Sequence, residues 1–163
     1  WALLHIRRDT VRLPNGKTAT REYNIHHGAV CIIPLLENGD VLLERQYRYP
    51  LGQELLELPA GKLERNGEDH RSAAIRELGE ETGLEAGELT YLGYMVSSPG
   101  FCDEKLHLYL ARGLTFGATH PDADEFLQVR RLPFDTLLAR CLSGEIEDGK
   151  TVAAVLKAKL LGL

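Results

Sequence analysis

The hydrophobic pattern along the chain predicts a series of strands and helices that share one core. Residues 29–36 are almost continuously apolar, which is typical of a strand buried on both faces. After a turn at residues 37–40, residues 41–49 predict a second strand that becomes polar towards its end. Later strands are expected at residues 89–96, 105–111 and 126–131, and later helices at residues 134–142 and 151–161. Together with a helix at residues 69–82, this order predicts a mixed α/β fold with helices on both sides of a sheet.

The N-terminal segment predicts a β-hairpin ahead of this core. Residues 11–18 read as a strand, a turn and the next strand, and the turn contains Asn15 and Gly16. This dipeptide is preferred in tight hairpins because both turn residues can take positive φ. A short isolated hairpin is only marginally stable in water, so we expect it to pack against another surface.

The composition limits the classes of protein to which the chain can belong. With 163 residues, of which 44% are hydrophobic, residues 1–163 are expected to form a single domain with its own core. The formal net charge of −5 argues against a nucleic-acid partner. No apolar run approaches the ~20 residues that span a bilayer, so no membrane partner is expected. The three cysteines form no CxxC pair, which favours the reducing cytoplasm.

The helix expected at residues 69–82 has an apolar stripe beside an acidic stripe. Residues 54–61 lead into a loop that precedes this helix, and the helix ends where Gly83 can adopt a left-handed C-cap. The apolar stripe consists of Ala74, Ile75, Leu78 and Thr82. The neighbouring acidic stripe, less than half a turn wide, consists of Glu77, Glu80 and Glu81.

The acidic stripe has two interpretations. The simpler one is a solvated helix face. However, Glu77 and Glu81 are four residues apart, and like charges at that spacing destabilise a helix by roughly a few tenths of a kcal/mol. A divalent cation such as Mg²⁺ would remove the repulsion, because it takes oxygen ligands and shares carboxylates with phosphates. Arg76 precedes Glu80 by four residues and can hold that carboxylate in place.

The wider sequence around this helix resembles a known family motif. Glu68 is followed by seven residues and then by Arg76-Glu-Leu-Gly-Glu-Glu-Thr-Gly83-Leu84. With Gly61 ahead of Glu68, this pattern resembles the Nudix box. Six residues separate Gly61 from Glu68, whereas the family has five, so we expect one extra residue in the loop before the helix.

The resemblance implies a metal-dependent hydrolase with Mg²⁺ as cofactor and Mn²⁺ as a substitute. It implies Glu77 and Glu81 as main metal ligands and Glu80 as a further ligand or a support for the bridging water. Glu68 would be a ligand or would orient Arg76. The backbone carbonyl of Ala60 would be another metal ligand. In this mechanism the metal neutralises a diphosphate and activates the attacking water.

Over nearly the whole chain the resemblance is to ADP-ribose pyrophosphatases. Residues 41–50, 57–62 and 98–104 look like the strand, the approach loop and the segment after the box in that group. It implies an α/β/α sandwich with a mixed sheet, and a homodimer in which the N-terminal strands within residues 1–27 lie at the interface. The implied reaction is hydrolysis of ADP-ribose to AMP and ribose 5-phosphate. The alternatives are another nucleoside diphosphate derivative such as GDP-mannose, or a non-catalytic domain that senses a nucleotide sugar.

Several residues outside the box are candidate substrate contacts. Arg48 would contact the diphosphate or ribose, since a guanidinium offers two donors to phosphate oxygens. Arg21 resembles another phosphate-facing position. Tyr47 and Phe101, together with Tyr23, are candidates to stack on adenine. Pro99 resembles a subfamily marker. The simpler interpretations are surface arginines, core aromatics and an ordinary Ser-Pro-Gly turn.

The general base has several candidates. Related enzymes place a carboxylate on a loop after the box, and here that loop contains Asp122, Asp124 and Glu125. Glu80 or Glu81 could serve instead. The sequence predicts structural or surface roles for His26, His27 and His107, and helix capping for Lys150 and Thr151.

Overall fold

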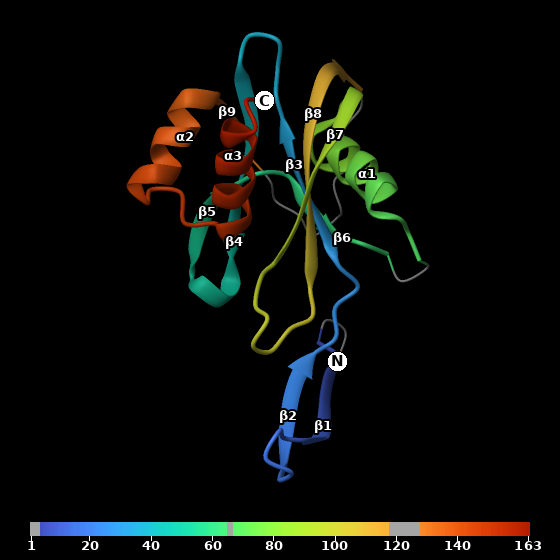
Figure 1. Ribbon diagram of the computed structural model, residues 1–163. Helices are drawn as coiled ribbons and strands as arrows, with labels where there is room; N and C mark the ends of the chain where they lie inside the picture. The colour runs from blue at the N-terminus through green and yellow to red at the C-terminus, as the bar shows by residue number, and fades with distance from the viewer. Residues whose placement is uncertain (1–3, 65–66, 118–127) are drawn as a thin grey trace.

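A computed structural model describes residues 4–64, 67–117 and 128–163 of the chain (Figure 1). Its strands and helices follow in the order β1 (Ile6–Arg12), β2 (Thr18–Asn24), β3 (Ala29–Pro34), β4 (Asp40–Arg48), β5 (Gln53–Glu57), β6 (Ala60–Lys62), α1 (His70–Thr82), β7 (Leu84–Val96), β8 (Lys105–Phe116), β9 (Gln128–Pro133), α2 (Phe134–Ser143) and α3 (Gly149–Leu160). A short 3-10 turn, Tyr49–Leu51, links β4 to β5.

The strands form three sheets, of which the central one is mixed. Its order is β6-β3-β8-β7, with β3 and β8 parallel and the other pairs antiparallel. A second, antiparallel sheet has the order β5-β4-β9, and β1 and β2 form a two-stranded sheet. Helix α1 lies on one side of the central sheet, and α2 and α3 lie on the other (Figure 1). The mixed α/β fold with helices on both sides is therefore confirmed.

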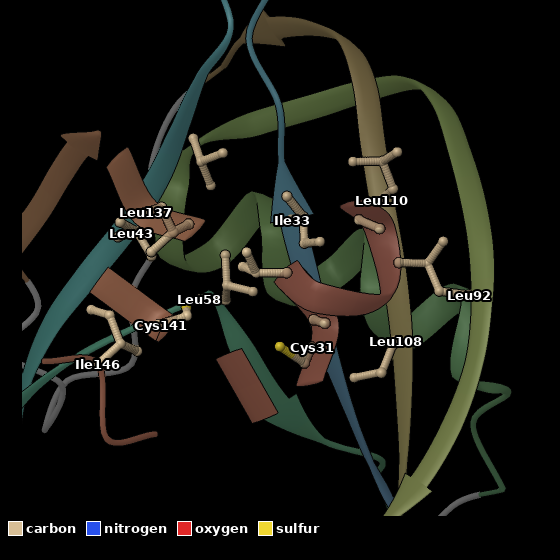
Figure 2. Close-up of a cluster of buried hydrophobic side chains, with 14 of the residues drawn as sticks. Cys31, Ile33, Leu43, Leu58, Leu92, Leu108, Leu110, Leu137, Cys141 and Ile146 are labelled. Carbon is tan, nitrogen blue, oxygen red and sulfur yellow. The ribbon is translucent and has the colours of Figure 1, made fainter. Parts of the chain in front are cut away.

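Strand β3 joins the two halves of the core because every one of its residues is buried. Alternate side chains of a strand point to opposite faces. Cys31 and Ile33 accordingly enter the core beside α3, which Figure 2 shows, whereas Val30 and Ile32 enter the core beneath α1. The continuous apolar run in the sequence is thus explained by burial on both faces.

The structure corrects three details of the expected elements. Residues 54–61, for which the sequence predicts no strand, include most of β5 and the start of β6, which pair with β4 and β3 respectively. Strands β7 and β8 are longer than expected and pair along most of their length, with a bulge between Tyr91 and Gly93. In the first hairpin only Gly16 has positive φ, at 82°, because the loop is longer than a two-residue turn.

Helix α1 begins and ends where the sequence predicts, but its buried face is rotated. Asp69 is the N-cap, and Gly83 forms the left-handed C-cap with φ 70°. Ile75, placed on the apolar stripe, is 52% exposed, while Ala73 and Glu81 are buried. The direction of the buried face depends on where β3 and β6 pack, so the helical periodicity alone could not decide it.

The β1–β2 hairpin extends away from the rest of the molecule (Figure 1). It joins the body at Asn24, whose N–H donates to Phe101 O at 2.8 Å and whose carbonyl accepts from Asp103 N at 3.3 Å. Across the described ranges, no helix has the length and apolar character needed to cross a membrane.

Candidate active site

A pocket of about 880 Å³ opens beside the acidic stripe of α1. Among the described residues, seven helices and strands contribute to its wall, namely β3, β4, β6, α1, β7, β8 and α3. The residues that matter most here are Arg48, Ala60, Gly61, Glu77, Glu81 and Lys150. This volume is within the ~300–1,000 Å³ typical of ligand sites. The structure therefore brings together the box helix, the Ala60–Gly61 segment and Arg48, as the sequence predicts.

Arg76 is the centre of the box. Its Nε and Nη2 donate to the two carboxylate oxygens of Glu68 at 2.9 and 3.0 Å. Its Nη1 donates to Glu77 at 2.8 Å and to Glu80 at 2.9 Å. These contacts raise the pKa of Arg76, the bonds to Glu68 contributing most, and the same bonds lower the pKa of Glu68. Glu68 contacts Arg76 as an orienting role requires, and both roles expected for Glu68 stay predictions.

Gly61 lies directly beneath the carboxylate of Glu77. A Cβ atom at Gly61 would be 1.9 Å from Cδ of Glu77 and 2.0 Å from its Oε1. No side chain larger than hydrogen fits there unless Glu77 moves. The glycine that opens the box is therefore required by close approach, despite the extra residue that follows it.

Glu81 is hydrogen-bonded to the Ala60–Gly61 segment. Its Oε2 accepts from the backbone N–H of Ala60 at 3.0 Å, and the residue is only 7% exposed. Because Ala60 pairs with Cys31 of β3, the central sheet, strand β6 and helix α1 jointly position this carboxylate. A buried, hydrogen-bonded carboxylate that also borders the pocket is suited to bind a cation there.

The oxygen ligands that this pocket offers suit Mg²⁺. Carboxylate and backbone carbonyl oxygens are the ligands that this hard cation prefers, and Glu77, Glu81 and Ala60 offer them to one pocket. Within the part of the chain that is described, no three acidic, histidine or cysteine side chains are grouped as a metal cluster. The guanidinium of Arg76 binds Glu68, Glu77 and Glu80.

A second charged group surrounds the buried carboxylate of Glu57, and its members Arg48, Asp148 and Lys150 border the pocket. Arg48 donates Nε and Nη2 to the two oxygens of Glu57 at 2.7 and 2.6 Å. Lys150 also donates to Glu57, and to Asp148 at 2.9 Å. Burial alone would raise the pKa of Glu57, but the bonds from Arg48 and Lys150 outweigh it and lower the pKa.

Lys150 is a pocket residue that sequence reasoning missed. The helix cap expected at Lys150 and Thr151 is made by Asp148, whose side chain accepts from Thr151 N. Burial would lower the pKa of Lys150, but Asp148 and Glu57 raise it, so the ammonium stays charged. Only its position in the first turn of α3, two residues after the N-cap Asp148, could have suggested that it faces another element.

A third wall comes from the ends of β7 and β8. Ser97 donates to Glu104, and His26 lies 3.6 Å from the other oxygen of that carboxylate. All three residues border the pocket. The sequence predicts no role for Glu104 within the segment 98–104 and a structural or surface role for His26, so this polar wall was also missed.

Other predicted site residues lie elsewhere. Among the described residues that border the pocket, Tyr47, Pro99, Phe101 and Arg21 are absent. Tyr47 is on β4, where Gln46 and Arg48 face the pocket and the intervening side chain points to the opposite face. The side chain of Arg21 donates to Thr20 O on the hairpin. Asp122, Asp124 and Glu125 lie outside the described residues, so their proposed roles stay predictions.

Comparison with known proteins agrees with this geometry. The NUDIX domain family matches residues 25–156. Over 149 residues the chain is 45% identical to a methanol dehydrogenase activator of Bacillus methanolicus, covering 90% of this chain and 80% of that protein. It is 40% identical, with the same coverage, to an ADP-ribose pyrophosphatase of Bacillus subtilis (strain 168).

A solved structure shows the same fold. The crystal structure of an ADP compounds hydrolase matches with a TM-score of 0.80 at 25% identity, covering 98% of this chain and 86% of the other. The family match spans most of the chain and includes the whole box from Gly61 to Leu84. This chain belongs to the NUDIX family.

Proposed function

We propose that this protein is a Mg²⁺-dependent pyrophosphohydrolase that converts ADP-ribose, or a closely related nucleoside-diphosphate sugar, to AMP and a sugar phosphate. The similarity to an ADP-ribose pyrophosphatase and to an ADP compounds hydrolase supports this substrate class. The observation that carries the proposal is one pocket with carboxylates on one wall, Glu77 and Glu81, and cations on another, Arg48 and Lys150.

The acidic wall suits the binding of the metal that activates water, and the wall with Arg48 and Lys150 suits the binding of the phosphates. A bound Mg²⁺ would neutralise the diphosphate and lower the pKa of the attacking water. Glu77 and Glu81, with the Ala60 carbonyl, would hold that ion, and Arg76 keeps Glu68 and Glu80 in place around them. Arg48 and Lys150 would bind phosphate oxygens, and Glu57 fixes the position of both cations at the pocket.

The remaining roles follow from chemistry and position. Ser97 and Glu104 offer a donor and an acceptor to sugar hydroxyls at the third wall. We assign the general base to Asp122 or Asp124, with Glu80 as the alternative. Residues 1–163 would act as one catalytic unit in the cytoplasm, and the β1–β2 hairpin would lie at a homodimer interface that also brings Arg21 to the partner's substrate.

A substrate panel tests the activity. ADP-ribose, GDP-mannose and a dinucleotide are each incubated with the protein and Mg²⁺ or Mn²⁺, and the products are identified by chromatography. We expect ADP-ribose to have the highest kcat/KM and AMP to be a product. A much higher kcat/KM for GDP-mannose would replace the proposed substrate. No turnover of any diphosphate would favour the sensing domain.

Two substitutions test the metal ligands. Glu77→Gln and Glu81→Gln each retain the shape of the side chain but remove the charge that holds the cation. We expect kcat/KM to fall by at least ~100-fold, because ligand carboxylates act directly on the reacting centre. The control is Glu37→Gln, an exposed glutamate in the β3–β4 turn, which should behave as wild type. Undiminished Mg²⁺-dependent turnover in either ligand variant would refute the assignment.

A further inference from the structure

Residues 58–60, which run from the end of β5 to the first residue of β6, make backbone hydrogen bonds at three successive positions. Leu58 N–H donates to Oγ1 of Thr151 at 2.9 Å. The carbonyl of Pro59 accepts from Ile32 N at 2.9 Å, and Ala60 N–H donates to Glu81 at 3.0 Å. The partner of Pro59, Ile32, belongs to the central sheet, and the partner of Ala60, Glu81, belongs to helix α1. The third partner, Thr151, comes from the C-terminal helix, 93 residues away in sequence.

The hydroxyl of Thr151 can hold only one orientation in this setting. The residue is fully buried, at 0% exposed. Its hydroxyl lies 2.5 Å from Oδ2 of Asp148, and an ionised carboxylate can only accept a hydrogen bond. The hydroxyl hydrogen therefore goes to Asp148, and an oxygen lone pair is left for Leu58 N–H. Asp148 also caps α3 by accepting from Thr151 N at 3.1 Å. The same carboxylate therefore fixes both the first turn of α3 and the orientation of the Thr151 hydroxyl.

The consequence of this bond reaches the acidic wall of the pocket. Leu58 is itself buried, at 1% exposed, and only Pro59 separates it from Ala60. A shift of the Leu58 peptide moves the Ala60 N–H that holds Glu81, and moves Gly61, which lies against Glu77. Both carboxylates that border the pocket from α1 thus depend on the same short segment.

We propose that Thr151 is a positioning residue, which acts through Leu58 and Ala60 to place Glu81 and Glu77 for cation binding. The proposal rests on the proposed function, because it assumes that these carboxylates hold the divalent metal. Thr151 itself touches neither metal nor substrate. It acts as outer-shell partners do, whose loss commonly reduces metal affinity or activity by about 10–100-fold.

The test compares Thr151→Val with Thr151→Ser. Valine has the shape of threonine but lacks the hydroxyl, so Leu58 N–H loses its acceptor, whereas serine retains the oxygen. We expect Thr151→Val to weaken Mn²⁺ binding, followed by electron paramagnetic resonance, by about tenfold or more. With substrate, kcat should fall by a similar factor, and KM should change by less than about threefold. Thr151→Ser should recover most of both losses.

A matched control separates positioning from loss of stability. Val155 is one turn further along α3, is fully buried in the core beside that helix, and makes no side-chain hydrogen bond. Val155→Ala should lower the melting temperature while Mn²⁺ affinity stays at the wild-type value. If Thr151→Val folds and binds Mn²⁺ within about twofold of wild type, or if Val155→Ala weakens Mn²⁺ binding equally, Thr151 is not a positioning residue.

Amide hydrogen exchange and Mn²⁺ binding need no substrate, and they distinguish the positioning role of Thr151 from the proposed hydrolase activity. In Thr151→Val, amide hydrogen exchange should become faster at Leu58 and Ala60, as measured by NMR. If wild type binds Mn²⁺ and only Thr151→Val loses that affinity, the positioning role holds even when ADP-ribose is not hydrolysed. If wild type hydrolyses ADP-ribose and Thr151→Val does so unchanged, only the positioning role fails. If wild type does not bind Mn²⁺, both proposals fail.

Discussion

Gly61 shows how a single residue without a side chain can set the geometry of a site. The carboxylate of Glu77 occupies the space where a Cβ would lie, and Arg76 holds that carboxylate from the side of the helix. Position 61 therefore requires a residue without a side chain, whereas position 83 requires a residue that adopts a left-handed φ. The sequence predicts a glycine in the motif at both positions, but only the structure distinguishes the two physical reasons.

Substitution of Gly61 should damage the site more than the fold. In Gly61→Ala the new Cβ would lie 1.9 Å from Cδ of Glu77, so the carboxylate must move. We expect kcat/KM to fall by about 10–100-fold, as for other displaced metal partners. The control is Gly79→Ala, also within the box, where the nearest atom to a Cβ is 3.9 Å away. Equal kcat/KM for Gly61→Ala and Gly79→Ala would contradict the close approach.

At the scale of elements, a group of stacked rings fastens the start of α1 to the β7–β8 pair. The rings of His70 and His107 are 4.0 Å apart and almost parallel, at 5°. The hydroxyl of Tyr91 bonds to Nδ1 of His107 at 2.9 Å, and that of Tyr109 bonds to His70 at 2.5 Å. The structural role expected for His107 agrees with these contacts, although nothing in the sequence shows which rings would meet.

This contact should make the stability of the fold depend on pH. Burial lowers the pKa of His107 below its ordinary value of 6.5, and His70 and Lys105 lower it further. The unfolded chain therefore binds a proton at this residue at a higher pH than the folded chain. The stability from neutral His107 is fully present above about pH 6.5 and is lost as the pH falls towards the lowered folded pKa.

Thermal unfolding between pH 7 and pH 5 measures the effect. The melting temperature of the wild type should fall across this range, and that of His107→Gln should fall less. The comparison variant is His27→Gln, at an exposed histidine outside these rings, which should retain the wild-type slope. An unchanged slope in His107→Gln would show that other groups cause the acid sensitivity.

At the scale of the whole molecule, the β1–β2 hairpin stands apart from the body. It is attached at Asn24 and leaves Ile6 58% exposed on β1. An isolated two-stranded hairpin is marginally stable in water, so a surface that covers it would stabilise it. A second copy of the chain is the partner expected from the sequence, because a closed two-fold dimer is the commonest arrangement of like chains.

Matched substitutions test this dimer. Ile6→Asp places a charge on the hairpin, and Leu160→Asp places one on an equally apolar but more exposed residue at the far end of the molecule (Figure 1). We expect light scattering to give twice the mass of one chain for wild type and Leu160→Asp, and a shift to the single chain for Ile6→Asp. A monomeric wild type, or a dimer that Ile6→Asp leaves intact, would exclude the hairpin interface.

The sequence by itself determined the features that depend on neighbouring residues. The bounds of α1 follow from its N-cap Asp69 and its C-cap Gly83, and the box spacing already places Arg76 next to its carboxylates. The continuous apolar run determined that β3 is buried on both faces. These features are local because capping, helical spacing and strand alternation act over a few residues.

Only the tertiary structure decided which distant segments meet. Lys150 reaches Glu57, and Thr151 reaches Leu58, across 93 residues of sequence. The buried face of α1 also depends on the strands against which it packs, which is why Ile75 is exposed although the helical pattern places it inside. Helical periodicity defines a stripe but not the neighbour that will cover it, and hydrogen bonds between distant elements leave no spacing in the sequence. The acidic wall of the pocket and Arg48 were therefore predictable, whereas Lys150 and the anchor at Thr151 were not.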